Sequence, residues 1–209
     1  MKAVLVAFVA VCAVGAAGCT AVAGPATPVA AATEPVAAGS SGLTADLLSV
    51  SDLPLGFQAQ DGTAAAAALG CAGIDGVYLP AGASEHAAVS FAHSLSSAFV
   101  NETISRRPGG AAVAALAAFG AAAKDCARFA GPDGTAYTVS AVTLPRYGDG
   151  SAAVRVTSAL AEGREVELAA VRVGDMLIAV AAAGTGAGDA DLTRTVLDRA
   201  LAKLTRTGH

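Results

Sequence analysis

The sequence contains no tryptophan, 4% aromatic residues and only three histidines among 209 residues. A folded domain of this composition has to build its core from small aliphatic side chains, because it has few rings to fill the interior. Lysine and arginine number 13 and form no cluster. Nucleic-acid binding needs such clusters to displace counterions from phosphates, so the composition argues against a nucleic-acid partner. It argues equally against a polybasic membrane patch.

Motifs of known enzymes are also missing. The chain has no Gly-x-Ser-x-Gly elbow, no His-Glu-x-x-His pair and no phosphate-binding glycine loop. His86 and His93 lie seven residues apart on one predicted strand, so they face opposite sides and cannot share a metal ion. We therefore predict a protein that is not an enzyme and has no metal site and no cofactor. A pocket that gathers one of these histidines with a carboxylate and a hydroxyl would revive the enzyme hypothesis.

The remaining charged side chains suggest ion pairs more than acid-base chemistry. Glu165 and Glu167 share one face of a predicted strand, and Arg155 and Arg172 lie on neighbouring strands. We predict cross-strand ion pairs on a solvated face. The adjacent arginines Arg106-Arg107 point to opposite faces of a strand, which disfavours a shared anion site.

The first 18 residues have the pattern of a secretory signal. Lys2 supplies a positive charge, residues 3–14 form a short apolar run, and Ala16-Ala17-Gly18-Cys19 ends it. The last four residues resemble the bacterial lipobox, in which the cysteine receives lipid and becomes the mature N-terminus. We predict lipidation of Cys19 and anchoring at the outer face of the cell membrane. The alternative is an ordinary signal peptide cut nearby, in which Cys19 is incidental.

Two of the four cysteines remain if Cys12 leaves with the signal and Cys19 carries lipid. In an oxidising compartment outside the cytoplasm, Cys71 and Cys126 most simply form one disulfide. The alternative is a pair of free buried thiols. Metal binding is disfavoured because no further cysteine or histidine lies at ligand spacing.

The mature chain divides into a linker and one domain. Residues 19–42 are rich in Ala, Pro, Thr and Gly and show no periodicity, which predicts a flexible tether. Residues 43–206 are long enough for a single domain with a proper core. We expect an alanine-rich helix over 63–70 and a long helix over 111–130.

Strand patterns dominate the second half of the domain. Alternating residues predict a strand over 86–95, and residues 98–106 are rich in strand-forming types but alternate less cleanly. A strand over 137–144 follows, and then a meander with a Gly174-Asp175 hairpin turn. An amphipathic helix with inward-facing Leu192, Val196 and Leu197 closes the chain. The predicted fold class is α+β, an antiparallel sheet of about five to six strands with helices packed on one side.

Three stretches together resemble a known family. Leu53-Pro54-Leu55-Gly56-Phe57, the helix from Ala118-Phe119 to Cys126, and the segments around Tyr147-Gly148-Asp149 and Val171-Arg172-Val173-Gly174-Asp175 are similar to actinobacterial envelope lipoproteins of the PknH-like extracellular sensor group. The resemblance covers residues 43–206. It implies an α+β domain with a cleft suggested to bind a ligand, usually with two disulfides, whereas this chain has cysteines for one. It carries over no catalytic residues.

The sequence therefore favours a non-catalytic lipoprotein that binds a small molecule, a lipid or an envelope protein between its sheet and helices. Its membrane contact runs through the N-terminal lipid. The alternative is a protein-interaction or structural accessory of the envelope, for which an exposed apolar patch without an enclosed cavity would be the sign.

Overall fold

The computed structural model describes residues 42–60, 68–79, 81–159, 165–184 and 189–207. All of them belong to one compact unit, Ala37–His209. The predicted signal, Cys19, the tether up to residue 41 and most of the helix predicted over 63–70 lie outside the described residues. Among the described residues, no helix has both the length and the apolar character needed to cross a bilayer.

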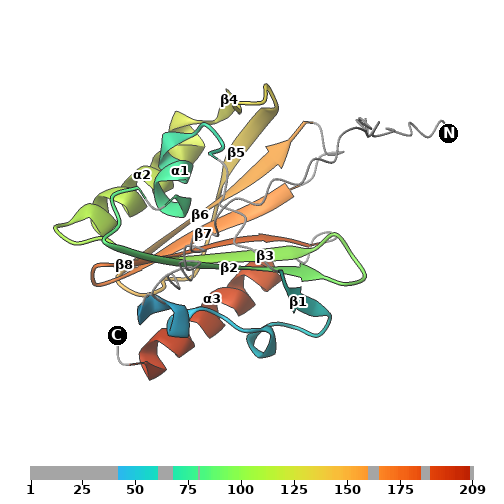
Figure 1. The fold of residues 1–209 in the computed structure, drawn as a ribbon. Helices are drawn as coiled ribbons and strands as arrows, with labels where there is room; N and C mark the ends of the chain where they lie inside the picture. The colour runs from blue at the N-terminus through green and yellow to red at the C-terminus, as the bar shows by residue number, and fades with distance from the viewer. Residues whose placement is uncertain (1–41, 61–67, 80, 160–164, 185–188, 208–209) are drawn as a thin grey trace, which may run out of the picture. The chain divides into compact units, whose positions relative to one another are not determined.

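The described residues form one antiparallel sheet of eight strands in the order β1-β2-β3-β8-β7-β6-β5-β4 (Figure 1). The strands are β1 (Phe57–Ala59), β2 (Glu85–His93), β3 (Phe99–Arg106), β4 (Arg128–Ala130), β5 (Ala136–Val142), β6 (Gly150–Ser158), β7 (Glu165–Val173) and β8 (Met176–Ala183). The predicted C-terminal meander is confirmed, since β5 to β8 pair with their neighbours in sequence. Gly174 makes the predicted hairpin turn with a φ of 60°.

The predicted number of five to six strands is wrong, since the sheet has eight. One of the additional strands, β4, lies within the range of the helix predicted over 111–130. Helix α2 (Ala111–Asp125) ends before Cys126, five residues short of the predicted end. Phe129 then pairs with Tyr137 across a hairpin, and the two rings stack with centroids 5.2 Å apart. The turn beginning at Gly131 and this aromatic pair outweigh the helical periodicity.

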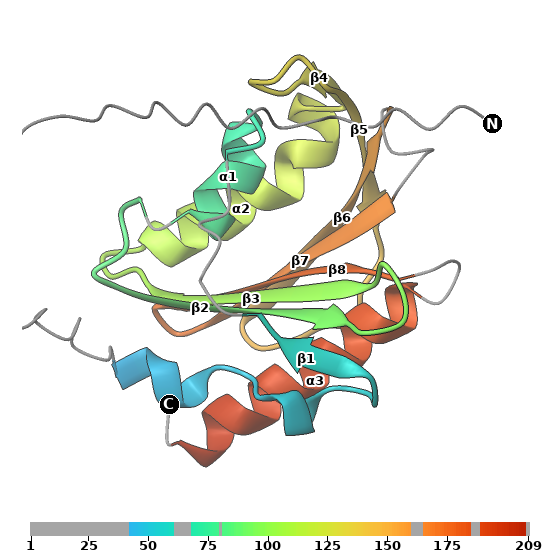
Figure 2. The ribbon, with the colours of Figure 1, turned by 45° about the vertical axis from the view of Figure 1, so that its right-hand side comes forward.

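The helices cover both faces of the sheet, so the prediction of helices on one side is also wrong. Helices α1 (Ala72–Tyr78) and α2 lie against one face, while α3 (Asp189–Arg206) and the 3-10 helices η1 (Gly42–Asp46) and η2 (Val50–Asp52) lie against the other (Figures 1 and 2). The reason lies in β8, whose eight residues are all buried and include no polar side chain. A strand that is apolar on both faces requires cover on both.

Each face has its own core. On the α3 side, Leu43, Leu47 and Leu48 pack with Val196 and Leu197 of α3, so the predicted inward face of that helix is confirmed. On the α1/α2 side, small alanines of α2 pack with Ile74, Val77 and Phe119. The predicted disulfide is present there: Cys71 and Cys126 are joined, with Cα atoms 6.0 Å apart. It ties the start of α1 to the end of α2.

Candidate functional site

The two helical layers cover different parts of the sheet. On the α1/α2 side, the described helices pack mainly on β5, β6, β7 and β8. On the other side, α3 packs on β7 and β8, and η1 packs on β2 and β3. Figure 2 shows α1 and α2 above the sheet and α3 and η1 below it, and both layers contact β7 and β8. In the described part of the chain, β2 and β3 therefore have little helical cover on the α1/α2 side.

This surface of β2 and β3 is polar. Strand alternation turns His86 and Ser90 of β2 toward it, together with Asn101, Thr103 and Ser105 of β3. The register places Ser90 opposite Asn101 and His86 opposite Ser105. Thr103 and Ser105 are buried, and the other three side chains are half-buried. We call these five side chains the β2–β3 face; they offer hydroxyl and amide groups that can donate and accept hydrogen bonds.

A buried arginine closes one end of the β2–β3 face. Arg107 is 4% exposed, and its guanidinium donates to the carbonyl oxygen of Leu79 at 2.8 Å and to Ser105 Oγ at 2.9 Å. Burial lowers the pKa of His86, and the Arg107 charge lowers it further, which favours the neutral imidazole. This end of the face suits a neutral polar group or an anion.

The β2–β3 face lacks the parts of a hydrolytic triad. His86 does lie opposite a hydroxyl, that of Ser105. The carboxylate of β3, Glu102, points to the other side of the sheet, where it aligns with Val180 of the α3-side core. Among the described side chains that β2 and β3 turn toward α1, none is a carboxylate. The arrangement can hold a ligand by hydrogen bonds.

On the opposite side, Glu102 is the centre of a buried charged network. Its side chain is fully buried, and its Oε2 accepts a hydrogen bond from the Leu48 amide at 2.6 Å. Its Oε1 has no hydrogen-bond partner among the residues that the structure describes. Burial raises the pKa of Glu102 to about 7; the Leu48 hydrogen bond and the Lys203 charge lower it, while the neighbouring Asp52 and Asp46 carboxylates raise it. This carboxyl therefore changes charge near neutral pH.

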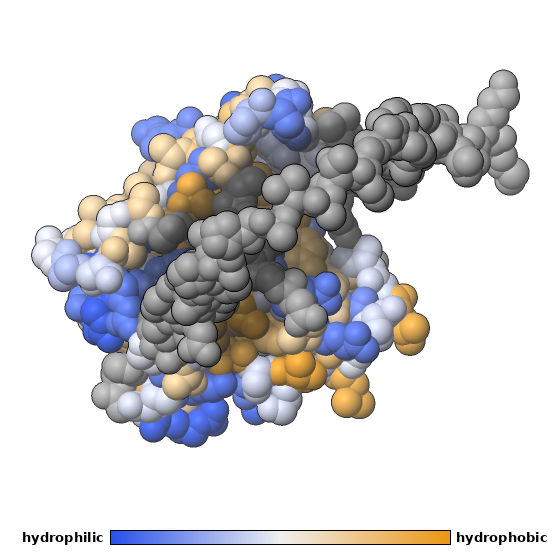
Figure 3. Space-filling view, in the orientation of Figure 1, coloured by the Kyte–Doolittle hydropathy of each residue, from blue (hydrophilic) through white to orange (hydrophobic). Residues whose placement is uncertain are grey.

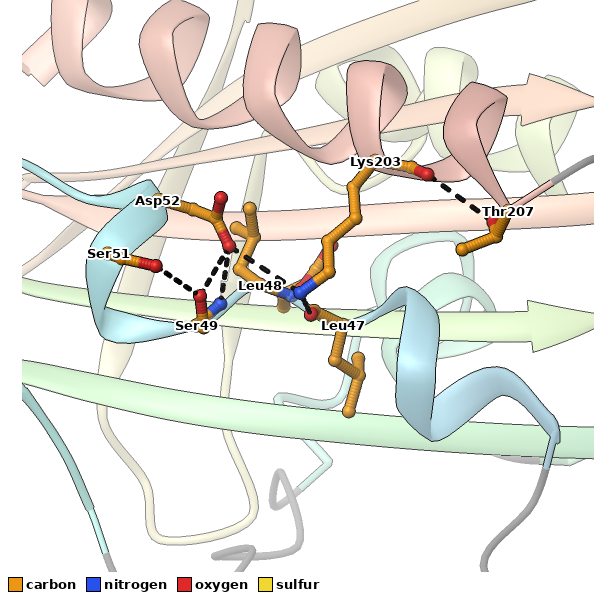
Figure 4. A network of polar contacts seen from close by, with 8 residues as sticks. Leu47, Leu48, Ser49, Ser51, Asp52, Lys203 and Thr207 are labelled. Carbon is orange, nitrogen blue, oxygen red and sulfur yellow. Dashed lines mark hydrogen bonds and ion pairs between the residues drawn. The ribbon is translucent and has the colours of Figure 1, made fainter.

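Lys203 joins the network from α3 (Figure 4). Its ammonium group donates to the Leu47 carbonyl oxygen and lies 3.5 Å from Asp52 Oδ2. Burial alone would raise the pKa of Asp52, but hydrogen bonds from the Ser49 hydroxyl and amide, together with the Lys203 charge, lower it overall. The network fastens residues 47–52 to the sheet and to α3, close to the point where the predicted tether enters the domain.

A third polar region lies on β6 and β7. Arg155 is 3.5 Å from Glu165 and 3.6 Å from Glu167, which confirms the predicted cross-strand ion pairs. The predicted solvated face is wrong for Glu167, because its side chain is 1% exposed. Neither of its carboxylate oxygens has a hydrogen-bond partner in the described part of the chain. Arg172 instead pairs with Asp149 at 3.2 Å. The register places Glu167 between Arg155 of β6 and Ala182 of β8.

The described residues also include an open pocket of about 700 Å³ at the edge of the sheet. Its lining comes from β4, β5 and β6 and includes the stacked Phe129 and Tyr137. It is a surface depression and not the cleft between sheet and helices that the sequence predicts.

The structure separates the residues that the sequence singled out. His93 is a packing residue, since its ring meets Phe57 edge-on at 5.3 Å and its Nδ1 accepts from the Leu95 amide at 3.2 Å. As predicted, it lies on the opposite face from His86. Arg106 and Arg107 diverge as predicted, because Arg106 pairs with Glu85 at 3.5 Å and Arg107 turns toward α1.

Glu102 is the polar residue that sequence reasoning missed. Its signal was present: it lies between Val100 and Ile104 in an alternating pattern, which places a carboxylate on a face of apolar residues.

No protein-family model matches the sequence, and no curated protein is similar to it at a significant level. Among solved structures, the fold is similar to the extracellular domain of PknH from Mycobacterium tuberculosis. The two chains share 18% sequence identity, and the TM-score is 0.45. The likeness covers 61% of this chain and 70% of that chain.

Proposed function

We propose that this chain is a non-catalytic, sensor-like binding module of the cell envelope, anchored by lipid on Cys19 to the outer face of the membrane. The β2–β3 face is the observation that supports binding: a row of buried and half-buried hydroxyl, amide and imidazole groups closed by the buried Arg107. Buried or half-buried polar groups that converge on one surface are typical of ligand sites. Its ligand is a small molecule, a lipid headgroup or an envelope component with hydrogen-bonding groups.

The disulfide supports a location outside the cytoplasm. Cys71 and Cys126 are joined across 55 residues, and such bonds persist in oxidising compartments. The lipobox-like Ala16-Ala17-Gly18-Cys19 supports the anchor. Two or three acyl chains on one residue would hold a protein at the membrane firmly, because each buried CH₂ contributes about 0.8 kcal/mol.

Intact mass of the protein extracted from its native membrane tests the anchor and the compartment together. We expect a mass that begins at Cys19 and includes acyl chains, with alkylation of Cys71 and Cys126 only after reduction. An unacylated mass, or thiols that react without reduction, would contradict the proposal.

Native mass spectrometry of the same extract tests binding. We expect a retained small molecule or lipid, and we expect the double variant Ser90→Ala and Asn101→Ala to lose most of it. The matched control is Thr138→Ala and Ser140→Ala, which removes two exposed polar side chains from β5. A protein that retains nothing from its membrane and binds nothing in a screen would favour the interaction or structural role instead.

A further inference from the structure

Two leucines at one end of the sheet are almost fully exposed. Leu55 is 98% exposed and Leu95 is 91% exposed, far more than the next large hydrophobic side chains, Val113 at 54% and Val50 at 45%. Leu55 lies in the turn before β1, and Leu95 lies in the turn between β2 and β3. In Figure 3, hydrophobic side chains protrude at the lower right, the end where Figure 1 places these two turns.

The two turns are fixed to each other. The Ser94 amide donates to the Gly56 carbonyl oxygen at 2.9 Å, and the register of β1 and β2 places Phe57 opposite His93. The His93 ring lies so close to Gly56 that a Cβ there would come within 2.3 Å of Nε2, and Gly56 has a φ of 98° that favours glycine. His93 therefore holds both turns, and the leucines project from a rigid base.

We propose that Leu55 and Leu95 insert into a lipid bilayer and orient the domain on the membrane. We call residues 54–56 and 94–97 the leucine turns. The proposal rests on the membrane location given under the proposed function, but not on the ligand of the β2–β3 face.

The chemistry of the leucine turns favours a bilayer over a protein partner. None of their other residues is charged: they are Pro54, Gly56, Ser94, Ser96 and Ser97. No charge therefore has to lose its hydration when the turns enter lipid. Two leucines expose on the order of 200 Å² of apolar surface. A stable protein interface buries about 800 Å² on each partner with matched shape. A bilayer accepts protruding apolar side chains without a complementary surface.

A long tether does not fix the orientation of the domain on the membrane, so a second contact between domain and membrane would be needed to do so. Residues 20–41 could span at most about 75 Å when fully extended. A domain of this size has a radius of gyration of about 15 Å. An anchor on such a tether keeps the domain near the membrane but leaves its orientation free. Insertion of the leucine turns would select one orientation.

The experiment uses residues 20–209 with an N-terminal histidine tag, bound to phosphatidylcholine and phosphatidylglycerol vesicles that contain nickel-chelating lipid. The nickel lipid replaces the acyl anchor, so the result does not depend on lipidation of Cys19. Ser96→Cys carries an environment-sensitive fluorophore, and nitroxide groups on the lipid chains act as quenchers. We expect a blue shift and quenching. The same label on Val113→Cys, on the surface of α2, should show neither.

Substitution of the leucines then tests the cause. In the Ser96→Cys background, Leu55→Ser and Leu95→Ser should each weaken vesicle binding of the untagged protein about tenfold, and together they should abolish the quenching. Val113→Ser is the matched control and should leave both readouts unchanged. A label that stays in water on the vesicles, or quenching that persists in the double leucine variant, overturns the proposal. Leucine-dependent crosslinking to an envelope protein, with the label in water, would identify a protein partner instead.

Discussion

The two faces of the sheet are stabilised in different ways. On the α1/α2 side, small alanines and glycines let two helices approach closely, and a disulfide joins their ends. On the α3 side, leucines from the N-terminal segment fill the core, and no disulfide is present among the described residues. There the N-terminal segment is held partly by the Glu102 network.

The buried charges also differ in sign. Of the charged side chains that the structure describes as buried, Arg107 lies toward α1, whereas Glu102, Glu167 and Asp46 lie toward α3. The groups that shift the pKa of Glu102, besides its burial, are Leu48, Lys203, Asp52 and Asp46, whereas the charge that shifts the pKa of His86 on the other side is that of Arg107. A disulfide and close helix packing, neither of which depends on ionisation, hold the α1/α2 face. The α3 face contains Glu102, whose carboxyl changes charge near neutral pH.

Removal of the disulfide should have the largest effect. The chain-entropy model gives about 4 kcal/mol for closing a loop of this length, the sequence separation being 55 residues. We expect the double variant Cys71→Ala and Cys126→Ala to lose about that much free energy of unfolding in urea. Hydrogen exchange should accelerate first in α1, because α1 holds to the rest of the domain mainly through α2.

The control for this prediction is the wild-type protein under reductant, which should match the double variant. The loss should be independent of pH between 5 and 8. A loss below about 1 kcal/mol, or equal acceleration of exchange in α3, would contradict the view that the disulfide belongs to one face.

Glu102 should make the other face sensitive to pH. Its pKa rises from 4.5 in the unfolded chain to about 7 in the folded protein. The folded state therefore binds more protons between these values, and the free energy of unfolding should fall by about 3 kcal/mol as the pH rises from below 4.5 to above 7. Glu102→Gln should abolish this contribution, so the variant should match the wild type at pH 4.5 and exceed its stability at pH 8.

Urea midpoints from pH 4.5 to 8 measure the difference between variant and wild type, and histidine titration cancels in that difference. Glu165→Gln is the matched control, because Glu165 is a half-exposed glutamate on the same side of the sheet. It should leave the pH dependence unchanged. Equal free energies of unfolding for Glu102→Gln and wild type at pH 8 would contradict this prediction, because they would show that ionised Glu102 does not destabilise the fold.

The strands were predictable where one face is buried and the other is not. The meander from β5 to β8 follows from alternation and short turns at Gly174-Asp175. The faces that the helices cover were not predictable from the sequence. Met176–Ala183 is apolar at every position, so its alternation does not distinguish one face of the sheet from the other. β4 was missed because three residues are too short for a period to be read, and its partner lies across a turn.

The candidate site was less predictable than the fold. The sequence shows the polar side chains of β2 and β3, but whether a ligand can reach them depends on which strands α1 and α2 leave uncovered. The sequence shows that Arg107 is charged but not that it is buried. Its guanidinium donates to the carbonyl groups of Leu79 and Ala81, which lie 28 and 26 residues earlier in the chain. Such contacts follow from tertiary packing and leave no local pattern.

Two glycines of α1 provide the finest test of the steric constraint. Gly73 faces α2 so closely that an added Cβ would lie 2.6 Å from the Ala118 carbonyl oxygen, whereas a Cβ on Gly76 would meet nothing within 4 Å. Gly73→Ala should force the helices apart and cost about 2 kcal/mol. Gly76→Ala should stabilise the same helix by about 0.5–1 kcal/mol, because alanine has the higher helix propensity.

Urea unfolding of both variants measures the two changes, which should have opposite sign. Both substitutions add one methyl group to one short helix, so propensity alone predicts that both stabilise it. A destabilised Gly73→Ala beside a stabilised Gly76→Ala therefore isolates the close approach of α1 to α2. If both variants gain stability, the helices have room to adjust, and the disulfide alone would account for the rigidity of that face.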